Sequence, residues 1–206
     1  MKKKAGRPAK SGSSANTRQK ILEAAMKIVA KEGFLQLSYP KLAKACKISQ
    51  PAVLHHYSNR EQLFRDMISQ VISEARILMS ETHQVHDNGA TRLKSYVNAT
   101  LHWAQKRPDL AQLIIYLYYY GTQEKLFADI YRTVREGAQA RIQEYLWQCY
   151  HEGSLKVKKE KISATASIIH ASTIGWAINR LATQENKNPL EEIDDEIDLF
   201  FESVLL

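Results

Sequence analysis

Apolar residues recur every three or four positions along most of this chain, which is the spacing of one face of an α-helix. No segment shows the alternation of apolar and polar residues that predicts a strand. The first apolar stripe lies between Asn16 and Glu32, and Gly33 after it suits a left-handed helix end. This stripe consists of Ile21, Leu22, Ala25, Ile28 and Val29. The pattern predicts an all-α protein whose first helix begins at Asn16 or Thr17.

A short second helix is predicted from Ser38, whose hydroxyl can cap the first turn. Pro40 would lie in that turn, where its missing N–H is no disadvantage. The expected buried side of this helix consists of Leu42, Ala43 and Cys46. A tight turn at Lys47 and Ile48 then leads to the next element.

A third helix is predicted from Ser49 to Tyr57, with Ser49 as N-cap and Pro51 in the first turn. Val53 and Tyr57 are four residues apart, so they share one face and can anchor the helix to a core. Its other side chains point elsewhere, and among them are Gln50, Leu54 and His55. Amide and imidazole groups, such as those of Gln50 and His55, contact base edges and phosphates in the DNA major groove. The two short helices therefore indicate a helix-turn-helix.

Longer helices follow in the sequence. Ser58 and Glu61 form a candidate capping box before a helix that continues past Ala75. Further helices are expected over residues 91–106, 109–120, 122–152 with Thr122 as N-cap, 162–185 and 190–206.

Positive charge is concentrated at the beginning of the chain. Residues 1–65 hold 14 Lys and Arg against 3 acidic residues, whereas residues 66–206 hold 15 against 19. A basic head on a mildly acidic body indicates that the head meets a polyanion.

Residues 1–15 are basic and rich in Gly and Ser, and we expect them to form a flexible arm. The step Gly6-Arg7-Pro8 resembles the core of AT-hook arms. Arg7 would then either enter an A·T-rich minor groove or belong to a solvated tail.

Residues 17–63 resemble the N-terminal domain of the tetracycline-repressor (TetR) family. The matching motifs are Thr17-Arg18-Gln19-Lys20-Ile21-Leu22-Glu23-Ala24-Ala25, Glu32-Gly33-Phe34, Lys41-Leu42-Ala43-Lys44-Ala45, and Ile48-Ser49 through His55-His56-Tyr57-Ser58-Asn59-Arg60-Glu61-Gln62-Leu63. The resemblance implies a helix-turn-helix DNA-binding domain over residues 16–63 and a helical effector-binding and dimerisation domain over residues 64–206. It also implies a transcriptional repressor that a ligand releases from DNA.

Two positions depart from the family pattern. Lys47 stands where the family usually has Gly, so the turn is either left-handed at a cost of roughly 1–2 kcal/mol or slightly remodelled. Leu54 stands where the family usually has a Tyr that touches phosphate. Leu54 could contact a thymine methyl group or simply lie at the protein surface.

The resemblance implies a set of DNA contacts, namely Ser38 or Tyr39, Gln50, Pro51, His55, His56 and Arg60. Gln50 can pair bidentately with adenine, and Arg60 adds charge to a helix N-terminus that already favours anions. His56 could instead pack inward against the scaffold.

The last two helices carry apolar faces that favour a homodimer. The candidate interface consists of Ala164, Ile168, Ala171, Gly175, Ile178, Ile193, Ile197, Phe200 and Val204. The opposite side of the first of these helices is also apolar, so one side can face the chain's own core and the other a partner. A two-fold dimer would set its recognition helices about 34–36 Å apart, or slightly more, so the operator should be a palindrome or near-palindrome. An entirely intramolecular core is the alternative.

Aromatic residues of the second domain are candidates for an apolar effector cavity, which the resemblance also implies. They are His102, Trp103, Tyr116, Tyr119, Tyr120, Phe127, Trp147, His170 and Trp176. Ordinary core packing is the alternative for each of them. The effector is a small molecule of unknown identity, for which an uncharged or anionic, partly apolar compound is the favoured class.

The sequence contains no catalytic or cofactor motif, so we expect neither an enzyme nor a cofactor. His83 and His86 are the nearest approach to a metal pair, and a solvated helix end explains them better. The cysteines Cys46 and Cys149 show no metal or redox spacing and are expected to be buried thiols of a cytoplasmic protein. No membrane segment is predicted. The remaining rival is an architectural DNA-binding protein, which would need no body of this size.

Overall fold

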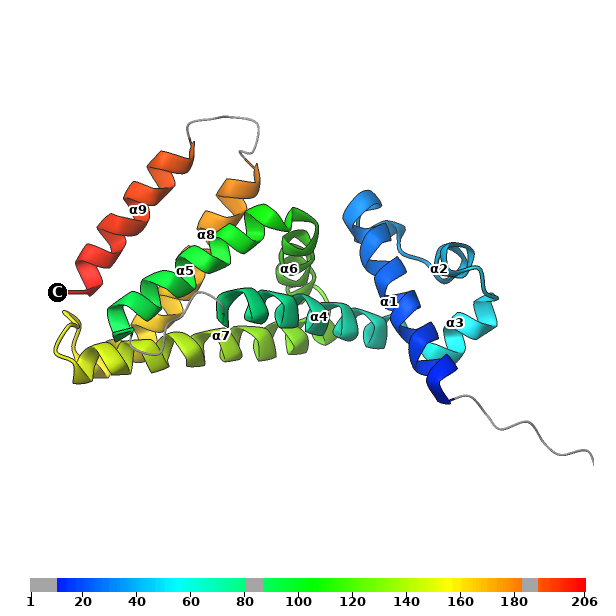
Figure 1. Cartoon of the computed structure of the whole chain (residues 1–206), viewed down its shortest axis with the longest axis horizontal. Helices are drawn as coiled ribbons and strands as arrows, with labels where there is room; N and C mark the ends of the chain where they lie inside the picture. Colours follow the sequence, from blue (N-terminus) through cyan, green and yellow to red (C-terminus); the bar gives the residue numbers. More distant parts are fainter. Residues whose placement is uncertain (1–10, 81–86, 183–188) are drawn as a thin grey trace, which may run out of the picture. The chain divides into compact units, whose positions relative to one another are not determined.

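The computed structural model describes residues 11–80, 87–182 and 189–206 (Figure 1). Arg7, His83 and His86 lie outside the described residues, and so does the side chain of Ile193. The described part of the chain is helical, with one isolated antiparallel bridge between Leu155 and Leu205 in place of any strand. The prediction of an all-α fold is therefore confirmed.

The chain divides into two compact units, residues 1–69 and 70–206. The division falls inside one long helix, α4 (Arg60–Ser80), rather than at residue 63 where the sequence places it. Helix α4 therefore contributes residues to both units.

The first unit consists of α1 (Ser11–Glu32), the 3-10 turn η1 (Phe34–Gln36), α2 (Tyr39–Cys46), α3 (Gln50–His56) and the beginning of α4. Apolar residues from all of these elements meet in one core, because the helix stripes bury surface that the short helices could not bury alone. Its most buried members include Ile21, Ala25, Leu42, Val53, Tyr57, Leu63, Phe64 and Met67.

Predictions for α1 and α2 are wrong at three points. Helix α1 begins at Ser11 rather than at Asn16 or Thr17, since no proline after Pro8 stops the helix from extending. Residues 11–15 are therefore helix and not arm. Cys46 is only half-buried, because the last turn of α2 lies at the edge of the core.

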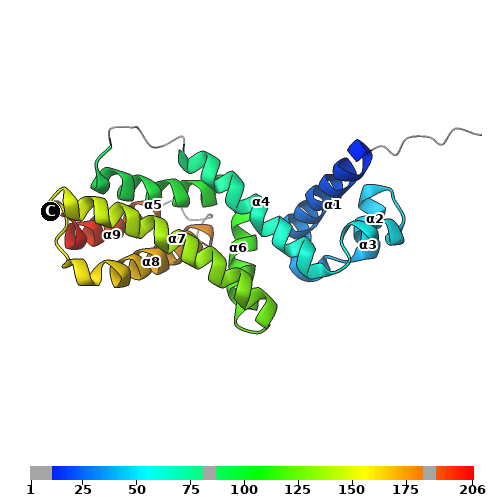
Figure 2. The ribbon, with the colours of Figure 1, turned by 90° about the horizontal axis from the view of Figure 1, so that it is seen from below.

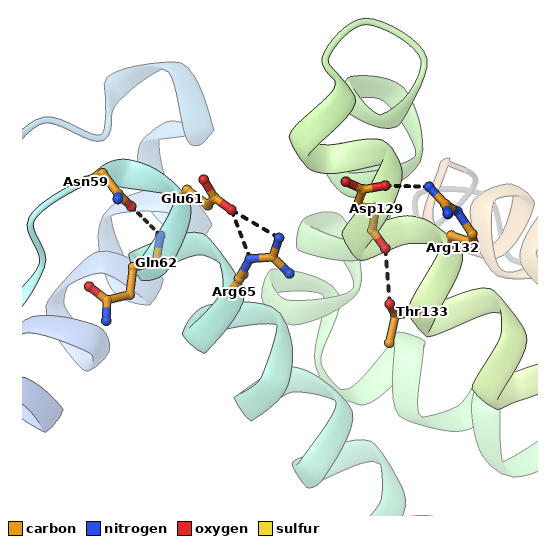
Figure 3. A network of polar contacts seen from close by, with 7 residues as sticks. All are labelled: Asn59, Glu61, Gln62, Arg65, Asp129, Arg132 and Thr133. Atoms are coloured by element: carbon orange, nitrogen blue, oxygen red, sulfur yellow. Dashed lines mark hydrogen bonds and ion pairs between the residues drawn. The ribbon is translucent and has the colours of Figure 1, made fainter.

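The beginning of α4 is capped by Asn59 and not by Ser58. The Asn59 side-chain oxygen accepts a hydrogen bond of 2.8 Å from the backbone N–H of Gln62 (Figure 3). Because the helix begins one residue later than a capping box requires, Glu61 does not reach back and instead pairs with Arg65 one turn further on (Figure 3).

Lys47 has φ 55° and ψ 44°, which is the left-handed conformation. It ends α2, and the N–H of Ile48 bonds to the carbonyl of Ala43 at 3.0 Å. The turn therefore keeps the geometry that glycine would adopt there, and a lysine holds it under strain.

The second unit contains the remainder of α4 and the helices α5 (Gly89–Lys106), α6 (Pro108–Gly121), α7 (Lys125–His151), α8 (Ile162–Ala182) and α9 (Pro189–Val204), with the turn η2 (Lys159–Lys161) before α8. Helix α7 packs against α5, α6 and α8, and Figure 2 shows it beside α5 and α8. The helices meet in a core that includes Leu93, Val97, Leu101, Leu113, Leu117, Ile142, Leu146, Ala166 and Ile169.

Helix ends in this unit are fixed by specific contacts. The side chain of Asn88 caps α5 by accepting from the Thr91 N–H at 2.8 Å. At Gly89 a Cβ atom would lie 2.6 Å from the backbone nitrogen of Cys149, so only glycine allows this approach of α5 to α7. Thr122 does not cap α7 as predicted; its hydroxyl donates back to the Tyr119 carbonyl at 2.7 Å and thus belongs to the end of α6.

The C-terminus is fastened within the second unit. The Lys156 N–H donates to the Val204 carbonyl, and the Leu206 N–H donates to the Ser154 carbonyl, each at 2.9 Å. Among the described residues, none of the helices combines the length and apolar character that crossing a membrane requires.

Replacing Lys47 by glycine should stabilise the protein. The substitution removes the left-handed strain, and we expect the free energy of unfolding to rise by about 0.5–1 kcal/mol after the greater freedom of glycine in the unfolded chain is subtracted. Urea unfolding followed by circular dichroism measures this difference. Lys44→Gly, inside α2, is the control and should lower stability by about 1 kcal/mol. A lower stability of Lys47→Gly would contradict the interpretation of strain.

Candidate functional site

Helix α3 presents one face to the core and another to solvent. The hydroxyl of Ser49 accepts from the Ala52 N–H at 3.3 Å, as the sequence predicts for an N-cap. Val53 and Tyr57 are completely buried, whereas Gln50, Pro51 and His55 are exposed. The polar groups of α3 are therefore open to an external partner.

Two further α3 side chains lie at the border of that exposed face. Leu54 is 38% exposed and makes α3 locally apolar there. His56 is half-buried, and its ring contacts that of His55 edge-on with 5.4 Å between centroids. Neither residue is turned into the core.

Tyr57, at the end of α3, belongs to a polar network that joins three helices. The Arg18 guanidinium of α1 donates to Oδ2 of Asp66 in α4 at 2.8 and 3.2 Å, and to the His56 carbonyl at 2.8 Å. The Tyr57 hydroxyl donates to the same Asp66 oxygen at 3.0 Å. The guanidinium also lies over the Tyr57 ring, 4.3 Å from its centroid. The network therefore fixes where α3 sits on its scaffold.

The protonation of Tyr57 suits this role. Burial raises the pKa of its phenol well above the usual value, and the hydrogen bond to Asp66 raises the pKa further. The hydroxyl accordingly remains a donor across the whole neutral range.

The N-termini of α2 and α4 were predicted to approach phosphates. Arg60 is exposed, with its guanidinium 5.4 Å from the centroid of the Phe34 ring. Ser38 is exposed, and its hydroxyl makes no capping bond. Tyr39 differs, because its hydroxyl is buried and burial raises the pKa of the phenol. Of the two alternatives left open by the sequence, Ser38 is thus the accessible one.

A cavity of about 230 Å³ lies in the second unit, among α4, α5, α6, α7 and α8. Two of the predicted aromatic residues, Trp103 and His170, line it. The lining also includes Tyr118, whose hydroxyl lies 2.8 Å from Nε2 of His170. The aromatic run at residues 116–120 of α6 therefore reaches the cavity, and it does so through Tyr118.

The other predicted cavity residues lie elsewhere. They are His102, Tyr116, Tyr119, Tyr120, Phe127, Trp147 and Trp176. Tyr119 and Trp147 are exposed, Tyr120 packs on Phe127, and the Trp176 indole donates to Glu196 of α9 at 3.0 Å. Neighbouring residues on a helix point about 100° apart, so the tyrosines of one run cannot share one direction.

A periodicity in the sequence could have identified the cavity wall of α6. The lining residues of α6 are Ala111, Ile114, Ile115 and Tyr118, which follow the three-and-four spacing of one helix face. No comparable signal marks the polar residues that other helices contribute, namely Arg76, Tyr96, Thr100, Thr133, Arg141 and Thr173.

The Tyr118–His170 pair is electrically neutral near pH 7. Burial raises the pKa of the Tyr118 phenol. Burial, followed by the positive charge of Arg135, lowers the pKa of His170 below its usual value. The pair therefore offers the cavity a neutral hydrogen-bonding group. Among the described residues there is no group of three or more side chains that could hold a metal ion.

Helix α8 has two apolar faces, as its spacing predicts. The face buried within the second unit consists of Ile162, Ala166, Ile169, Thr173 and Trp176. The exposed face consists of Ala164, Ile168, Ala171, Gly175 and Ile178. An exposed apolar stripe of this kind is typical of a contact surface.

The predicted interface on α9 is wrong in part. Ile197 and Val204 are 3% and 5% exposed, so they face the chain's own core, and Phe200 is half-buried with its ring edge-on to Trp176. An amphipathic helix shows the same apolar stripe in its sequence whether it packs on its own domain or on a partner. In this chain the stripe of α9 packs on its own domain. Among the α9 side chains that the structure describes, the exposed apolar one is instead Leu199, at 70%.

Residues 21–67 match the sequence model of bacterial regulatory proteins of the tetR family. A comparison with curated proteins gives no significant match.

Solved structures similar to this fold come from distant relatives. A TetR transcription regulator from Haloarcula marismortui has a TM-score of 0.79 at 14% identity, covering 93% of this chain and 100% of that one. A Saccharomonospora viridis protein described as a transcriptional regulator was solved in complex with choline. It has a TM-score of 0.79 at 15% identity, covering 93% of this chain and 99% of that one. A transcriptional regulator from Rhodococcus sp. Rha1 has a TM-score of 0.74 at 18% identity, covering 91% of this chain and 95% of that one. At these identities the likeness establishes the fold.

Removing the Asp66 carboxylate should weaken the attachment of α3 to α1 and α4. In Asp66→Ala the Arg18 guanidinium and the Tyr57 hydroxyl lose their shared acceptor, and we expect a local loss of about 1–3 kcal/mol. Hydrogen–deuterium exchange of α3 amides, measured by mass spectrometry, should accelerate about tenfold or more.

Glu61→Ala is the matched control, because it also removes an α4 carboxylate that is paired with an arginine. That pair is exposed and should contribute at most about 0.5 kcal/mol. Equal protection of α3 in both variants would show that the Asp66 network does not hold the helix.

Proposed function

We propose that this chain, a member of the TetR family of bacterial regulatory proteins by its N-terminal domain, is a homodimeric repressor that binds a palindromic operator and leaves it when a small molecule binds. The family match supports a DNA-binding regulator of transcription. The observation that carries the finer proposal is the division of α3, which is anchored by Val53 and Tyr57 and leaves Gln50 and His55 exposed.

Helix α3 is proposed to enter the major groove. The carboxamide of Gln50 can pair with N6 and N7 of an adenine, and the His55 imidazole can bond to a base edge or a phosphate. Leu54 is exposed enough to contact a thymine methyl group. Ser38 and Arg60, each at the start of a helix, would meet the phosphates that fix the register.

The basic residues at the beginning of the sequence also support this proposal. Residues 2–10 carry Lys2, Lys3, Lys4, Arg7 and Lys10. We assign Arg7 to the minor groove beside the operator, where a narrow A·T-rich segment attracts guanidinium groups.

Dimerisation is proposed to bury the exposed face of α8. Ala164, Ala171 and Gly175 are small, so they allow the backbones of two helices to approach closely around Ile168. The exposed Leu199 of α9 would extend this surface. Two-fold symmetry would then present two copies of α3 to a palindrome.

Regulation is proposed to act through α4. This helix supplies Asp66 to the DNA-binding unit and Val71, Ile72 and Ala75 to the cavity wall. A ligand that binds one position of α4 more tightly than another shifts the population of that position. The choline complex of the Saccharomonospora protein supports a ligand-binding body in this fold, although a cavity lining without carboxylates does not suit a cation.

Alanine at Gln50 or His55 should weaken operator binding and relax base preference. Loss of a good base contact corresponds to about 1–3 kcal/mol, and nonspecific binding should change little because it depends on phosphate contacts. Selection of operator sequences from random DNA, followed by fluorescence anisotropy at several salt concentrations, measures both quantities.

Gln36→Ala removes an exposed glutamine outside α2 and α3 and serves as the control. Unaltered affinity and preference in the Gln50 and His55 variants would refute the assignment of α3. A protein that selects no sequence at all would be architectural rather than regulatory.

Aspartate at Ile168 should convert the dimer to a monomer. The substitution places charge in the middle of the exposed α8 face, where pairing would bury it without a partner. Light scattering coupled to size exclusion should give the mass of one chain, and operator affinity should fall as well. Leu35→Asp changes a highly exposed leucine outside α8 and should remain dimeric. A wild-type monomer that binds its operator fully would refute the dimer.

A further inference from the structure

The cavity of the second unit is mostly apolar and small. Isoleucine, valine and alanine side chains from α4, α5, α6, α7 and α8 provide most of its wall. Its volume of about 230 Å³ lies below the ~300–1,000 Å³ of pockets for drug-sized ligands. A compact molecule with an apolar body therefore fits it.

The charges in the cavity lining are all positive. Arg76 of α4 and Arg141 of α7 belong to the lining, and no Asp or Glu does. In the described part of the chain, neither guanidinium has a carboxylate within ion-pair distance. Arg107 and Arg132, by contrast, are paired with carboxylates. The two lining arginines are thus available to an anion.

Both guanidinium groups act on the same phenol. Tyr96 lines the cavity, and burial raises the pKa of its hydroxyl, while the charges of Arg141 and Arg76 oppose that rise. Both arginines line the same cavity as Tyr96 and lie near enough to act on its phenol. Arg76 is exposed and Arg141 is half-buried, so both guanidinium groups can be reached from solvent.

A buried donor in the wall also calls for an acceptor. The Trp103 side chain is 5% exposed and lines the cavity, and its indole N–H has no acceptor among the described residues. Buried N–H groups are nearly always bonded, so an oxygen of a bound molecule would complete this one.

We propose that the cavity binds a small carboxylate with an apolar body, whose carboxylate lies between Arg76 and Arg141. Guanidinium groups suit this role because they bind carboxylates through parallel hydrogen bonds. The neutral Tyr118–His170 pair would contact the body of the ligand rather than its charge. This inference rests on the proposed ligand-relieved repressor, and it names the chemical class of the ligand.

Three probes of one skeleton test the charge preference on the full-length protein. They are 3-phenylpropionate, 3-phenylpropanamide and 3-phenylpropylamine, which are negative, neutral and positive at pH 7. Isothermal titration calorimetry should give the tightest binding for the carboxylate, with about tenfold weaker binding for the amide and weaker still for the amine. Equal affinities, a preference for the amine, or no binding of the carboxylate at millimolar concentration would overturn the inference.

Variants assign the preference to the named residues. Arg141→Met should weaken carboxylate binding about tenfold and leave amide binding unchanged, and Arg141→Lys should retain part of the preference. Arg132→Met is the matched control, because Arg132 lies on the same helix, is paired with Asp129 and does not line the cavity (Figure 3). An equal loss of carboxylate affinity in Arg132→Met, or no loss in Arg141→Met, would show that Arg141 does not bind the carboxylate.

Operator release is measured separately, by fluorescence anisotropy with and without 3-phenylpropionate. Carboxylate binding that leaves the DNA complex intact would support the site and contradict the ligand-relieved repressor. Release of the operator by the amine but not by the carboxylate would support the ligand-relieved repressor and contradict the carboxylate site.

Discussion

The arrangement of the DNA-binding unit depends on one carboxylate. Asp66 of α4 accepts from Arg18 of α1 and from Tyr57 at the end of α3, so three helices that are separate in sequence share a single oxygen atom. Arg18 and Asp66 are about one-third exposed, which limits the Coulomb attraction between them. The network therefore matters chiefly for position. A helix of seven residues has little stability of its own, and its direction must come from such contacts.

The elements that sequence reasoning placed well are those with local signals. Ser49, Pro51 and the spacing of Val53 and Tyr57 define α3 within nine residues, and the structure reproduces each feature. The predicted N-cap of α4 was wrong by one residue. Ser58 and Asn59 are both good N-cap residues, and only the surrounding chain selects between them. Local chemistry thus predicts that an element exists more firmly than where it ends.

The second unit was harder because its site is assembled from five helices. Which aromatic ring faces a shared cavity depends on how the helices are rotated, and Tyr118 rather than Tyr119 has that direction. The α9 stripe shows the same limit, because Ile197 and Val204 would look identical in sequence whether they cover their own core or a partner. Amphipathic spacing indicates that a face is covered and does not say by what.

The two thiols of the chain differ in access. Gly89 backs directly onto Cys149, which is fully buried, whereas Cys46 at the end of α2 is half-open and only weakly engaged by the Lys20 carbonyl at 3.7 Å. Burial raises the pKa of both thiols, so alkylation is slow and mild alkali favours it. A maleimide dye applied to the folded protein would consequently attach in the DNA-binding unit alone, and the natural sequence already provides a single-site reporter there.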